Sequence, residues 1–505
     1  MSGITKRFGD VLANDSVDFR VKKGEIHALV GENGAGKTTL MNILYGLYHP
    51  DSGKIIINDE EKKISSPSGA IDLGIGMVHQ HFMLVGTLTV LENIVLGYED
   101  VSFGGLLNLS AARKKLDALI KAFNLNIDLN IKIENLPIGI QQKIEILKVL
   151  YRKSNILIFD EPTAVLTPLE TEELFGLFRG LKQQGKTIIL ITHKLGEVLT
   201  ISDSVTVLRH GKAAGEKITA KTNRTELAEM IVGGSVPSAE QKSKQPGTKI
   251  ILDVKNLVVE SDKKINAVND ISFQINSGEI FGIAGVEGNG QTELAEAING
   301  LRNIKSGEIK FTNPRLRGEE FGKKRKREIS HIPADRHKHG IVNDYKLFEN
   351  VLLGRQEEEL FTSNIVINEK KLVEFTKDII NKFDVRPEDP MQAISGLSGG
   401  NQQKLVVSRE LTKESDLIIA CHPTRGLDIK AAAFVLNTLL EQRNFGKAVL
   451  LVSSELTELM QVSDRIGVMY EGKIIAILNP AETNEREIGM YMTGLNDKIQ
   501  NSNVN

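Results

Sequence analysis

The stretch GENGAGKT at 31–38 has the residue types and spacing of a phosphate-binding loop. It fits the pattern G-x-x-x-x-G-K-[ST], follows an apolar run and is followed by a helical pattern. Glycines let backbone N–H groups surround phosphate oxygens, and the amino end of a helix adds partial positive charge. In this pattern Lys37 reaches the β- and γ-phosphates and Thr38 binds Mg²⁺. The loop therefore predicts a nucleoside triphosphate as ligand.

A pair of acids supplies the second half of such a site. Asp160 and Glu161 end the apolar run ILIFDE. An aspartate at the end of a buried strand can bind hydrated Mg²⁺, and the adjacent glutamate can orient or deprotonate an attacking water. The pair alone is weak evidence, because surface turns also carry acids. Downstream of a phosphate loop it predicts triphosphate hydrolysis.

Buried strands must position these residues. The runs at 25–31, 155–160 and 186–193 are continuous and apolar, and 170–185 has the spacing of an amphipathic helix that Gly185 ends. Alternation of such strands with helices predicts an α/β core around a mostly parallel sheet. The stretch from about 85 to 155 is richer in helical patterns and is interpreted as an inserted helical subdomain.

The sequence contains this arrangement twice. Residues 22–40 match 276–294 at an offset of 254, and after a shift to 257 the offset settles at 261, which pairs Asp160 with Cys421. A register that holds in blocks indicates two homologous domains. We predict a first domain, a flexible polar linker, a second domain and a disordered tail, at 1–232, 233–249, 250–494 and 495–505.

Composition narrows the class of protein. The 505 residues are 41% apolar and 25% charged, with a net charge of −2, so the chain lacks the basic excess of most nucleic-acid-binding proteins. The single cysteine excludes an intrachain disulfide and fits a reducing compartment. No signal peptide opens the chain and no apolar run reaches the ~18 residues of a membrane span. We interpret KKRKR at 323–327 as a solvated surface rather than a site for an anionic partner, and the histidines in HKH at 337–339 as exposed rather than metal-binding.

The motifs together resemble one family. The phosphate loop, DEPT at 160–163, ITH at 191–193 and LSGGNQQ at 397–403 are similar to the motifs of ATP-binding cassette (ABC) ATPases, and the likeness covers nearly the whole chain. The resemblance implies two tandem P-loop NTPase domains. Each would have a RecA-like α/β core with an antiparallel β subdomain and a helical subdomain.

The resemblance also implies roles for single residues. Glu161 would be the catalytic acid, His193 the switch histidine at the γ-phosphate, and Gln80 the glutamine that senses Mg²⁺ and couples to the transporter. The implied Mg²⁺ ligands are Thr38, Gln80 and Asp160. The implied ATP contacts are Phe8, stacked on adenine, with Gly31, Asn33, Gly34, Gly36, Lys37, Thr38, Thr39, and, from the signature loop, Ser398, Gly399, Gly400, Asn401 and Gln402.

In this family each ATP lies between the phosphate loop of one domain and the signature loop of the other. One such site here would have every part intact. The other would collect all the departures from the pattern, and we expect that it does not turn over ATP. These departures are Gln291 for the lysine, Cys421 and His422 for the acids, Ser454 for the switch histidine, Ala334 at the register of Gln80, and Pro137 and Ile138 for Ser-Gly in the signature LPIGIQQ.

Asymmetric pairs of this kind resemble the ATP-binding subunits of bacterial importers for nucleosides and simple sugars. LPIGIQQKIEILK, GVEGNGQTEL, IPADRHKHGI and HPTRGLDI favour the nucleoside branch, and sugar-importing relatives more often carry arginine where Gln291 stands. The resemblance implies two transmembrane permease subunits and a substrate-binding lipoprotein that acts through the permease. It also implies a peripheral location on the cytoplasmic face of the cell membrane, with no nucleic acid as partner.

Alternative interpretations are the same motor for a ribose- or galactose-type sugar, and a soluble tandem ABC ATPase that acts on ribosomes. Proteins of the ribosomal class usually keep both catalytic sites, a long charged linker and a basic balance, all of which this chain lacks. A non-catalytic regulator is disfavoured by the intact acids. Relatives usually carry further residues ahead of ITKRFG at 4–9, so we expect a missing edge strand and a loosely held Phe8.

Overall fold

In the computed structural model, the apolar runs of the first copy form the centre of a six-stranded sheet. Every residue of β3 and of β9 is buried, because elements pack on both faces of the sheet. Pairing is parallel except at one edge, where β11 runs antiparallel to β10. The strand order is β11 (Lys212–Ile218), β10 (Ser204–Arg209), β3 (Ile26–Val30), β9 (Thr187–Ile191), β8 (Ile156–Asp160) and β7 (Ile75–Val78).

The structure describes residues 1–494 except 33, 80–82, 100–107, 123–124, 126, 164–165, 235–244, 287, 312–328 and 364–365. The chain divides into two compact units, 1–236 and 237–505. The greater part of the predicted linker, the basic run at 323–327 and the whole predicted tail lie outside the described residues.

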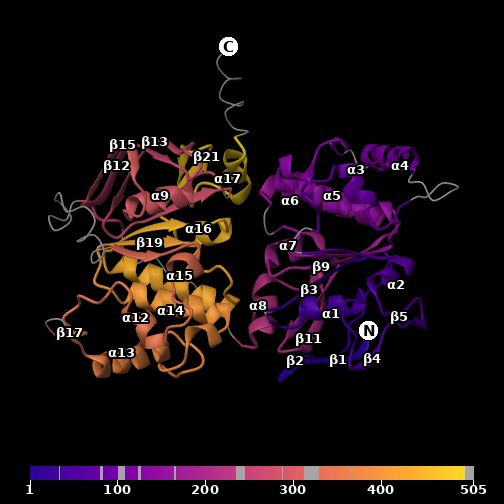
Figure 1. Cartoon of the computed structure of the whole chain (residues 1–505), viewed down its shortest axis with the longest axis horizontal. Helices are drawn as coiled ribbons and strands as arrows, with labels where there is room; N and C mark the ends of the chain where they lie inside the picture. Colours follow the sequence, from indigo (N-terminus) through magenta and orange to yellow (C-terminus); the bar gives the residue numbers. More distant parts are fainter. Residues whose placement is uncertain are drawn as a thin grey trace, which may run out of the picture. The chain divides into compact units, whose positions relative to one another are not determined.

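A small antiparallel sheet and a helical group lie on opposite sides of the central sheet in the first unit (Figure 1). The antiparallel sheet shares one apolar core with α1, and the inserted helices α3–α5 build a core of their own. The elements of this part are β1 (Ser2–Phe8), β2 (Val11–Val17), β4 (Ser52–Lys54), β5 (Ile56–Ile57), β6 (Glu60–Glu61), α1 (Lys37–Leu44), α2 (Pro67–Asp72), α3 (Val90–Val95), α4 (Leu109–Ala122), α5 (Ile138–Tyr151), α6 (Pro168–Gln183), α7 (Leu195–Ile201) and α8 (Arg224–Val232).

The amphipathic pattern at 170–185 forms α6, and its ends have local causes. Thr167 accepts a hydrogen bond from the N–H of Glu170, whose carboxylate accepts one from the N–H of Thr167. Pro168 occupies the first turn, where its missing N–H costs nothing. Gly185 follows the helix with φ of 80°, a left-handed conformation that glycine adopts without strain.

The expectation of a missing edge strand is wrong. β1 is present and lies between β2 and β4, in the same position that β12 takes in the second unit. Phe8, the last residue of β1, packs edge-to-face on Tyr48 with ring centroids 5.1 Å apart. Residues Ser2–Phe8 form a strand, because they pair with β2 on one side and with β4 on the other.

The second unit repeats the fold. Its six-stranded sheet has the order β22–β21–β14–β20–β19–β16, its antiparallel sheet the order β13–β12–β15, and cores lie on both faces of the central sheet. Its elements are β12 (Ile250–Glu260), β13 (Asn266–Asn276), β14 (Ile280–Gly285), α9 (Gln291–Ile298), β15 (Ile304–Phe311), β16 (Ile329–Ile332), α11 (Arg336–His339), α12 (Leu347–Leu352), β17 (Thr362–Ser363), β18 (Val366–Ile367), α13 (Glu369–Lys382), α14 (Gly399–Leu411), β19 (Leu417–Cys421), α15 (Ile429–Asn444), β20 (Ala448–Val452), α16 (Leu456–Val462), β21 (Arg465–Tyr470), β22 (Lys473–Leu478) and α17 (Glu485–Met492).

Candidate ATP site

Three loops meet at the carboxyl edge of the first unit's central sheet. They follow β3, β8 and β9, which are adjacent and parallel. The loop after β3 contains the glycines and Lys37, the end of β8 brings Asp160 and Glu161, and the loop after β9 brings His193. Ligands of open α/β sheets bind outside the carboxyl ends of the strands, so the predicted phosphate and acid residues are gathered where such a ligand lies.

Close backbone packing explains two glycines of the phosphate loop. A Cβ on Gly31 would lie 2.2 Å from the carbonyl oxygen of Leu208, and one on Gly36 would lie 2.2 Å from that of Ala13. Gly36 also has φ of 96° and is the N-cap of α1. A side chain at either position would push the loop off the strands beneath it, so the glycines fix how closely the loop packs.

The ammonium group of Lys37 lies inside the loop. Its Nζ donates to the carbonyl oxygens of Gly31 at 2.8 Å and Glu32 at 2.9 Å, and the residue is buried. Burial lowers the pKa of Lys37, against the opposing charges of Glu161 and Asp160. The loop therefore holds a buried cation among its own carbonyl oxygens.

Thr38 and Asp160 bring oxygen ligands together. Asp160 is buried and accepts a hydrogen bond from the Thr38 side chain. Burial, with a smaller effect from the charge of Glu161, raises the pKa of Asp160 to about 6. Hydroxyl and carboxylate oxygens are the hard donors that Mg²⁺ prefers, so this pair fits the ion.

Glu161 adopts strained backbone geometry beside His193. Its φ is 47°, unusual for a residue other than glycine, and its N–H donates to the carbonyl of Ile191 at 2.9 Å. Glu161 Oε1 lies 2.9 Å from His193 Nδ1. Burial raises the pKa of Glu161, but the hydrogen bond and charge of His193, with Lys37 and Lys194, outweigh burial and hold it below its usual value. The result is an ionised carboxylate oriented by an imidazole.

Phe8 lies on the antiparallel sheet rather than in these loops. Phe8 is 42% exposed, with Lys6 Nζ 5.5 Å from its ring centroid. Tyr48, which sequence reasoning did not single out, forms the other side of this aromatic pair. Two of the predicted residues, Asn33 and Gln80, lie outside the described residues.

The signature residues belong to the second unit and begin α14. Ser398 is the N-cap and accepts from the N–H of Asn401, while Gln402 donates to the carbonyl oxygens of Ile394 and Leu397. Arg336 packs over this turn, since a Cβ on Gly399 would lie 2.6 Å from its guanidinium. Nothing in the sequence patterns singled out this cation. The histidines at 337 and 339 are exposed, as predicted.

The second unit keeps the loop and changes its chemistry. Gln291 donates from Nε2 to the carbonyl of Val286 at 3.0 Å, so an uncharged amide takes the position of the lysine. Burial raises the pKa of Cys421 to about 12, which leaves a neutral thiol at the register of Asp160. His422 follows it with φ of 46°. The thiol and the amide do not supply the charges that Mg²⁺ and phosphate require.

Sequence reasoning also missed Asn14 in β2. Its Nδ2 donates to the carbonyl of Gly36 at 3.2 Å, and Oδ1 is buried without a hydrogen-bond partner among the described residues. The repeat offers a signal, because the residue at the same register of the second copy is the apolar Val268. Asn14 thus anchors the end of the phosphate loop in one unit alone.

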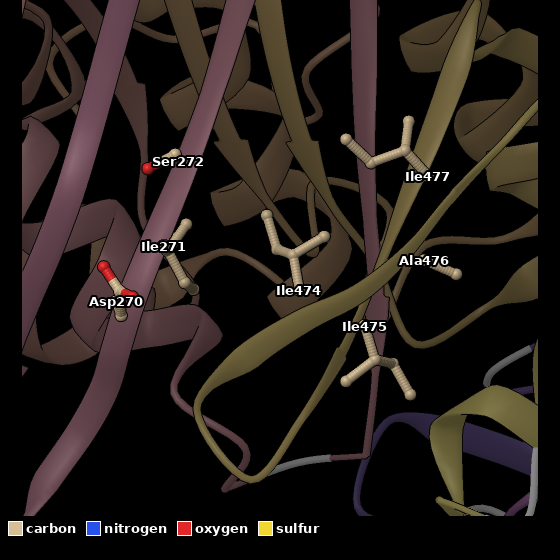
Figure 2. A pocket seen from close by; sticks show the side chains of 7 residues that line it. All are labelled: Asp270, Ile271, Ser272, Ile474, Ile475, Ala476 and Ile477. Atoms are coloured by element: carbon tan, nitrogen blue, oxygen red, sulfur yellow. The ribbon is translucent and has the colours of Figure 1, made fainter. Parts of the chain in front are cut away.

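A surface hollow lies elsewhere in the fold. It measures about 330 Å³ and lies between β13 and β22 of the second unit (Figure 2). Ile271 and Ile474 extend toward one another from the two strands in this view. None of the residues that line it belongs to the motifs. The lining residues are Asp270, Ile271, Ser272, Ile474, Ile475, Ala476 and Ile477.

Known proteins resemble both the sequence and the fold. The chain is 47% identical to the guanosine import ATP-binding protein NupO of Bacillus subtilis, over 99% of this chain and 98% of that protein. It is 44% identical to the nucleoside import ATP-binding protein NupA of Lactococcus lactis, over 98% of each. A ribose import ATP-binding protein, RbsA of the same species, is 37% identical over 98% of this chain and 99% of its own length.

Among solved structures, a chain in the complex of an archaeal ribosomal stalk protein with an archaeal ribosome recycling factor matches 98% of this chain and 92% of its own length. Its TM-score is 0.66 at 18% identity, a likeness of fold alone. The ABC transporter family model matches residues 14–164 and 268–425. The predicted tandem fold is confirmed, and the chain belongs to the ABC transporter family as an ATPase with two P-loop domains.

Proposed function

We propose that this ATPase powers nucleoside import and has one competent and one degenerate ATP site. The observation that carries the proposal is the gathering of Lys37, Asp160 and Glu161 at one sheet edge, against Gln291, Cys421 and His422 in the other unit. Relatives named for guanosine and nucleoside import, at 47% and 44% identity, favour nucleosides as cargo. Relatives named for ribose import reach 37%, which keeps a simple sugar as the second candidate.

Hydrolysis at the competent site uses the groups of the three loops. The phosphate loop binds the β- and γ-phosphates through its N–H groups, and Lys37 neutralises charge that develops on them. Glu161 orients a water in line with the γ-phosphorus and accepts its proton, while His193 holds Glu161 and contacts the γ-phosphate. Thr38, Asp160 and Gln80 would hold Mg²⁺, which when bound offsets the charge on the β- and γ-phosphate oxygens.

The remaining contacts complete the proposed ATP site. Phe8 stacks on adenine, because its ring is exposed at the end of β1. The signature loop approaches the γ-phosphate with the Ser398 hydroxyl and the N–H groups of a helix amino end. The proposed contacts are Gly31, Asn33, Gly34, Gly36, Thr38 and Thr39 in the first domain (1–232) and Ser398, Gly399, Gly400, Asn401 and Gln402 in the second (250–494).

The degenerate site does not turn over ATP. Loss of a general base alone costs about 10²–10⁴ in rate, and this site also lacks the lysine charge and a carboxylate for Mg²⁺. Its signature turn begins at Pro137, which has no N–H to donate and no side-chain cap. The second unit then serves as signature donor and scaffold for the competent site.

The cargo crosses the membrane through partners. Among the described residues no helix has the length and apolar character of a membrane span. Two permease subunits provide the path, a substrate-binding lipoprotein delivers the nucleoside to them, and this chain docks on the cytoplasmic face of the membrane.

Uptake of labelled guanosine and of labelled ribose tests the proposal. Cells with Glu161→Gln in place of the native chain are expected to lose guanosine uptake and keep ribose uptake. The matched control is His422→Gln at the same register of the second unit, which is expected to leave both uptakes unchanged. Loss of ribose uptake alone would move the cargo to the second candidate. Unchanged uptake of both would refute the importer proposal, and co-sedimentation with ribosomes would then be measured.

A further inference from the structure

One carboxylate joins the two loops that carry Glu161 and His193. Glu197, in the first turn of α7, accepts a hydrogen bond from the hydroxyl of Thr163 at 2.6 Å on Oε1, and one from Thr192 at 3.1 Å on Oε2. Both threonines are buried. Thr163 comes two residues after Glu161, and Thr192 directly precedes His193. Each oxygen of Glu197 therefore holds one catalytic loop.

The geometry of Glu161 needs such support. A residue other than glycine with φ of 47° is strained, and the strain persists only where surrounding contacts determine the conformation. One contact is the N–H of Glu161 on the carbonyl of Ile191, and the next is the anchor at Thr163. Lys194 adds to the bridge, because its N–H donates to the Thr192 hydroxyl and its Nζ to the carbonyl of Thr163.

The second unit has the same bridge without the catalytic pair. Glu458 accepts from Thr424 at 2.7 Å and from Ser453 at 3.1 Å, at the registers of Thr163 and Thr192. The neighbouring charge is inverted, since Glu455 stands where the first unit has Lys194. Burial, together with Glu455, raises the pKa of Glu458 to about 7. The chain thus contains an internal control for what this bridge does to the fold alone.

We propose that Glu197 is a positioning residue for ATP hydrolysis, whose carboxylate sets the spacing between Glu161 and His193 through Thr163 and Thr192. The inference rests on the proposed function, because it concerns the same competent site. Glu197 acts through other residues and is not itself part of the phosphate loop. Its loss is therefore expected to slow turnover and to leave nucleotide binding unchanged.

Steady-state Mg-ATP hydrolysis by the purified full chain tests the inference. Glu197→Gln keeps one acceptor oxygen and is expected to lower kcat about 10-fold, and Glu197→Ala about 10²-fold, as for other groups that orient a reacting residue. The KM for ATP is expected to stay within about twofold, because Lys37 and the glycines keep their contacts. The matched variant Glu458→Gln is expected to leave kcat unchanged.

A second series separates positioning from folding. Thr163→Val with Thr192→Val removes both donors and is expected to lower kcat as far as Glu197→Ala does, and adding Glu197→Ala is expected to cause no further loss. If adding Glu197→Ala to the two valine substitutions lowered kcat further, by the factor it causes alone, Glu197 would act by another route and the inference would be overturned. Equal losses from Glu458→Gln and Glu197→Gln would assign the bridge to folding alone and would also overturn it.

Glu161→Gln in the same assay distinguishes the two levels of failure. If Glu161→Gln abolishes hydrolysis and Glu197→Ala does not slow it, the inference fails and the proposed function stands. If Glu161→Gln leaves hydrolysis intact, the assignment of the competent site fails, and the inference fails with it.

Discussion

The two units of this chain share the order of the central sheet and the geometry of the phosphate loop, and they differ in the chemistry of that loop. The six strands of each central sheet follow one order, and the last glycine of each phosphate loop has nearly the same φ, 96° at Gly36 and 98° at Gly290. The strained turn after the sheet is also preserved, with φ of 47° at Glu161 and 46° at His422. At the registers of Lys37, Asp160 and Glu161 the backbone is kept and the side chains differ, with Gln291, Cys421 and His422 in the second unit.

This contrast separates what holds a P-loop domain together from what makes it hydrolyse ATP. Glycines, backbone hydrogen bonds and apolar strands maintain the loop geometry in both units. Gln291 satisfies one of the loop carbonyls that Lys37 satisfies in the first unit, so the fold tolerates loss of the charge. We expect that catalysis does not tolerate it, because phosphates need a cation in the loop.

The largest effect, on the rate of ATP hydrolysis, is expected from exchanging Lys37 and Gln291. Lys37→Gln keeps a donor to the loop carbonyls and removes the charge, so hydrolysis should fall about 10²–10³-fold with the fold intact. Steady-state ATPase assays measure the fall, and circular dichroism checks the fold.

The reciprocal Gln291→Lys is the control for this exchange. It restores a cation and leaves Cys421 and His422 in place, so no second hydrolytic site should appear. If the double variant, with both Lys37→Gln and Gln291→Lys, hydrolysed ATP at the native rate, the site of the second unit would be able to hydrolyse ATP.

The next largest effect, on stability, is expected from a buried ion network in the second unit. Glu410 pairs with Arg409 at 2.8 Å and Lys413 at 2.7 Å, where the first unit has the apolar Val149. Glu410→Gln leaves two buried cations without their carboxylate and should destabilise the second unit by about 3 kcal/mol. Hydrogen exchange should show loss of protection there, with the first unit as control.

The same network predicts an acid-sensitive unit. Burial opposes ionisation of Glu410, but Lys413 and Arg409 outweigh burial and lower its pKa to about 2. A lowered folded-state pKa means that the stabilisation is complete above the unfolded value of about 4.3 and is lost as the pH falls toward 2. The second unit should lose more stability than the first over this interval, and equal losses would contradict the prediction.

A smaller effect is expected at the anchor of the phosphate loop. Asn14→Val removes the hydrogen bond to Gly36, and with it about 1 kcal/mol, so ATP should bind roughly 5-fold more weakly. Isothermal titration with ATP measures the change. Val268→Asn, at the same register of the second unit, is the matched variant and should leave this affinity unchanged.

The smallest effect is expected at the two signature turns. Ser398→Ala removes the side-chain cap of α14 and should cost about 1 kcal/mol in urea unfolding of the second unit. Pro137→Ala removes no side-chain cap, and the first unit should change by less than about 0.5 kcal/mol. A larger cost at Pro137 would mean that the degenerate turn has a structural role of its own.

Much of the fold could be predicted because its signals are local and repeated. The apolar runs predicted β3, β8 and β9, and Gly185 predicted the end of α6. Because the two copies match in register, each element predicted in the first copy was also predicted in the second. The missing edge strand was a wrong prediction, because β1 pairs with β2, which follows it directly, and with β4, which lies more than 40 residues further along the chain.

The sequence by itself determined which residues carry charge in each copy, and this is the basis for the proposal that only one of the two sites hydrolyses ATP. The glycines, the lysine and the acids lie in short motifs, so their types and spacing can be identified from the sequence without the fold. Only the tertiary structure decided how Asn14, Tyr48 and Glu197 support that site, because their partners lie 22, 40 and 34 residues away in the chain, at Gly36, Phe8 and Thr163. Hydrogen bonds and ring contacts over such separations exist only once the strands have paired and brought the loops together.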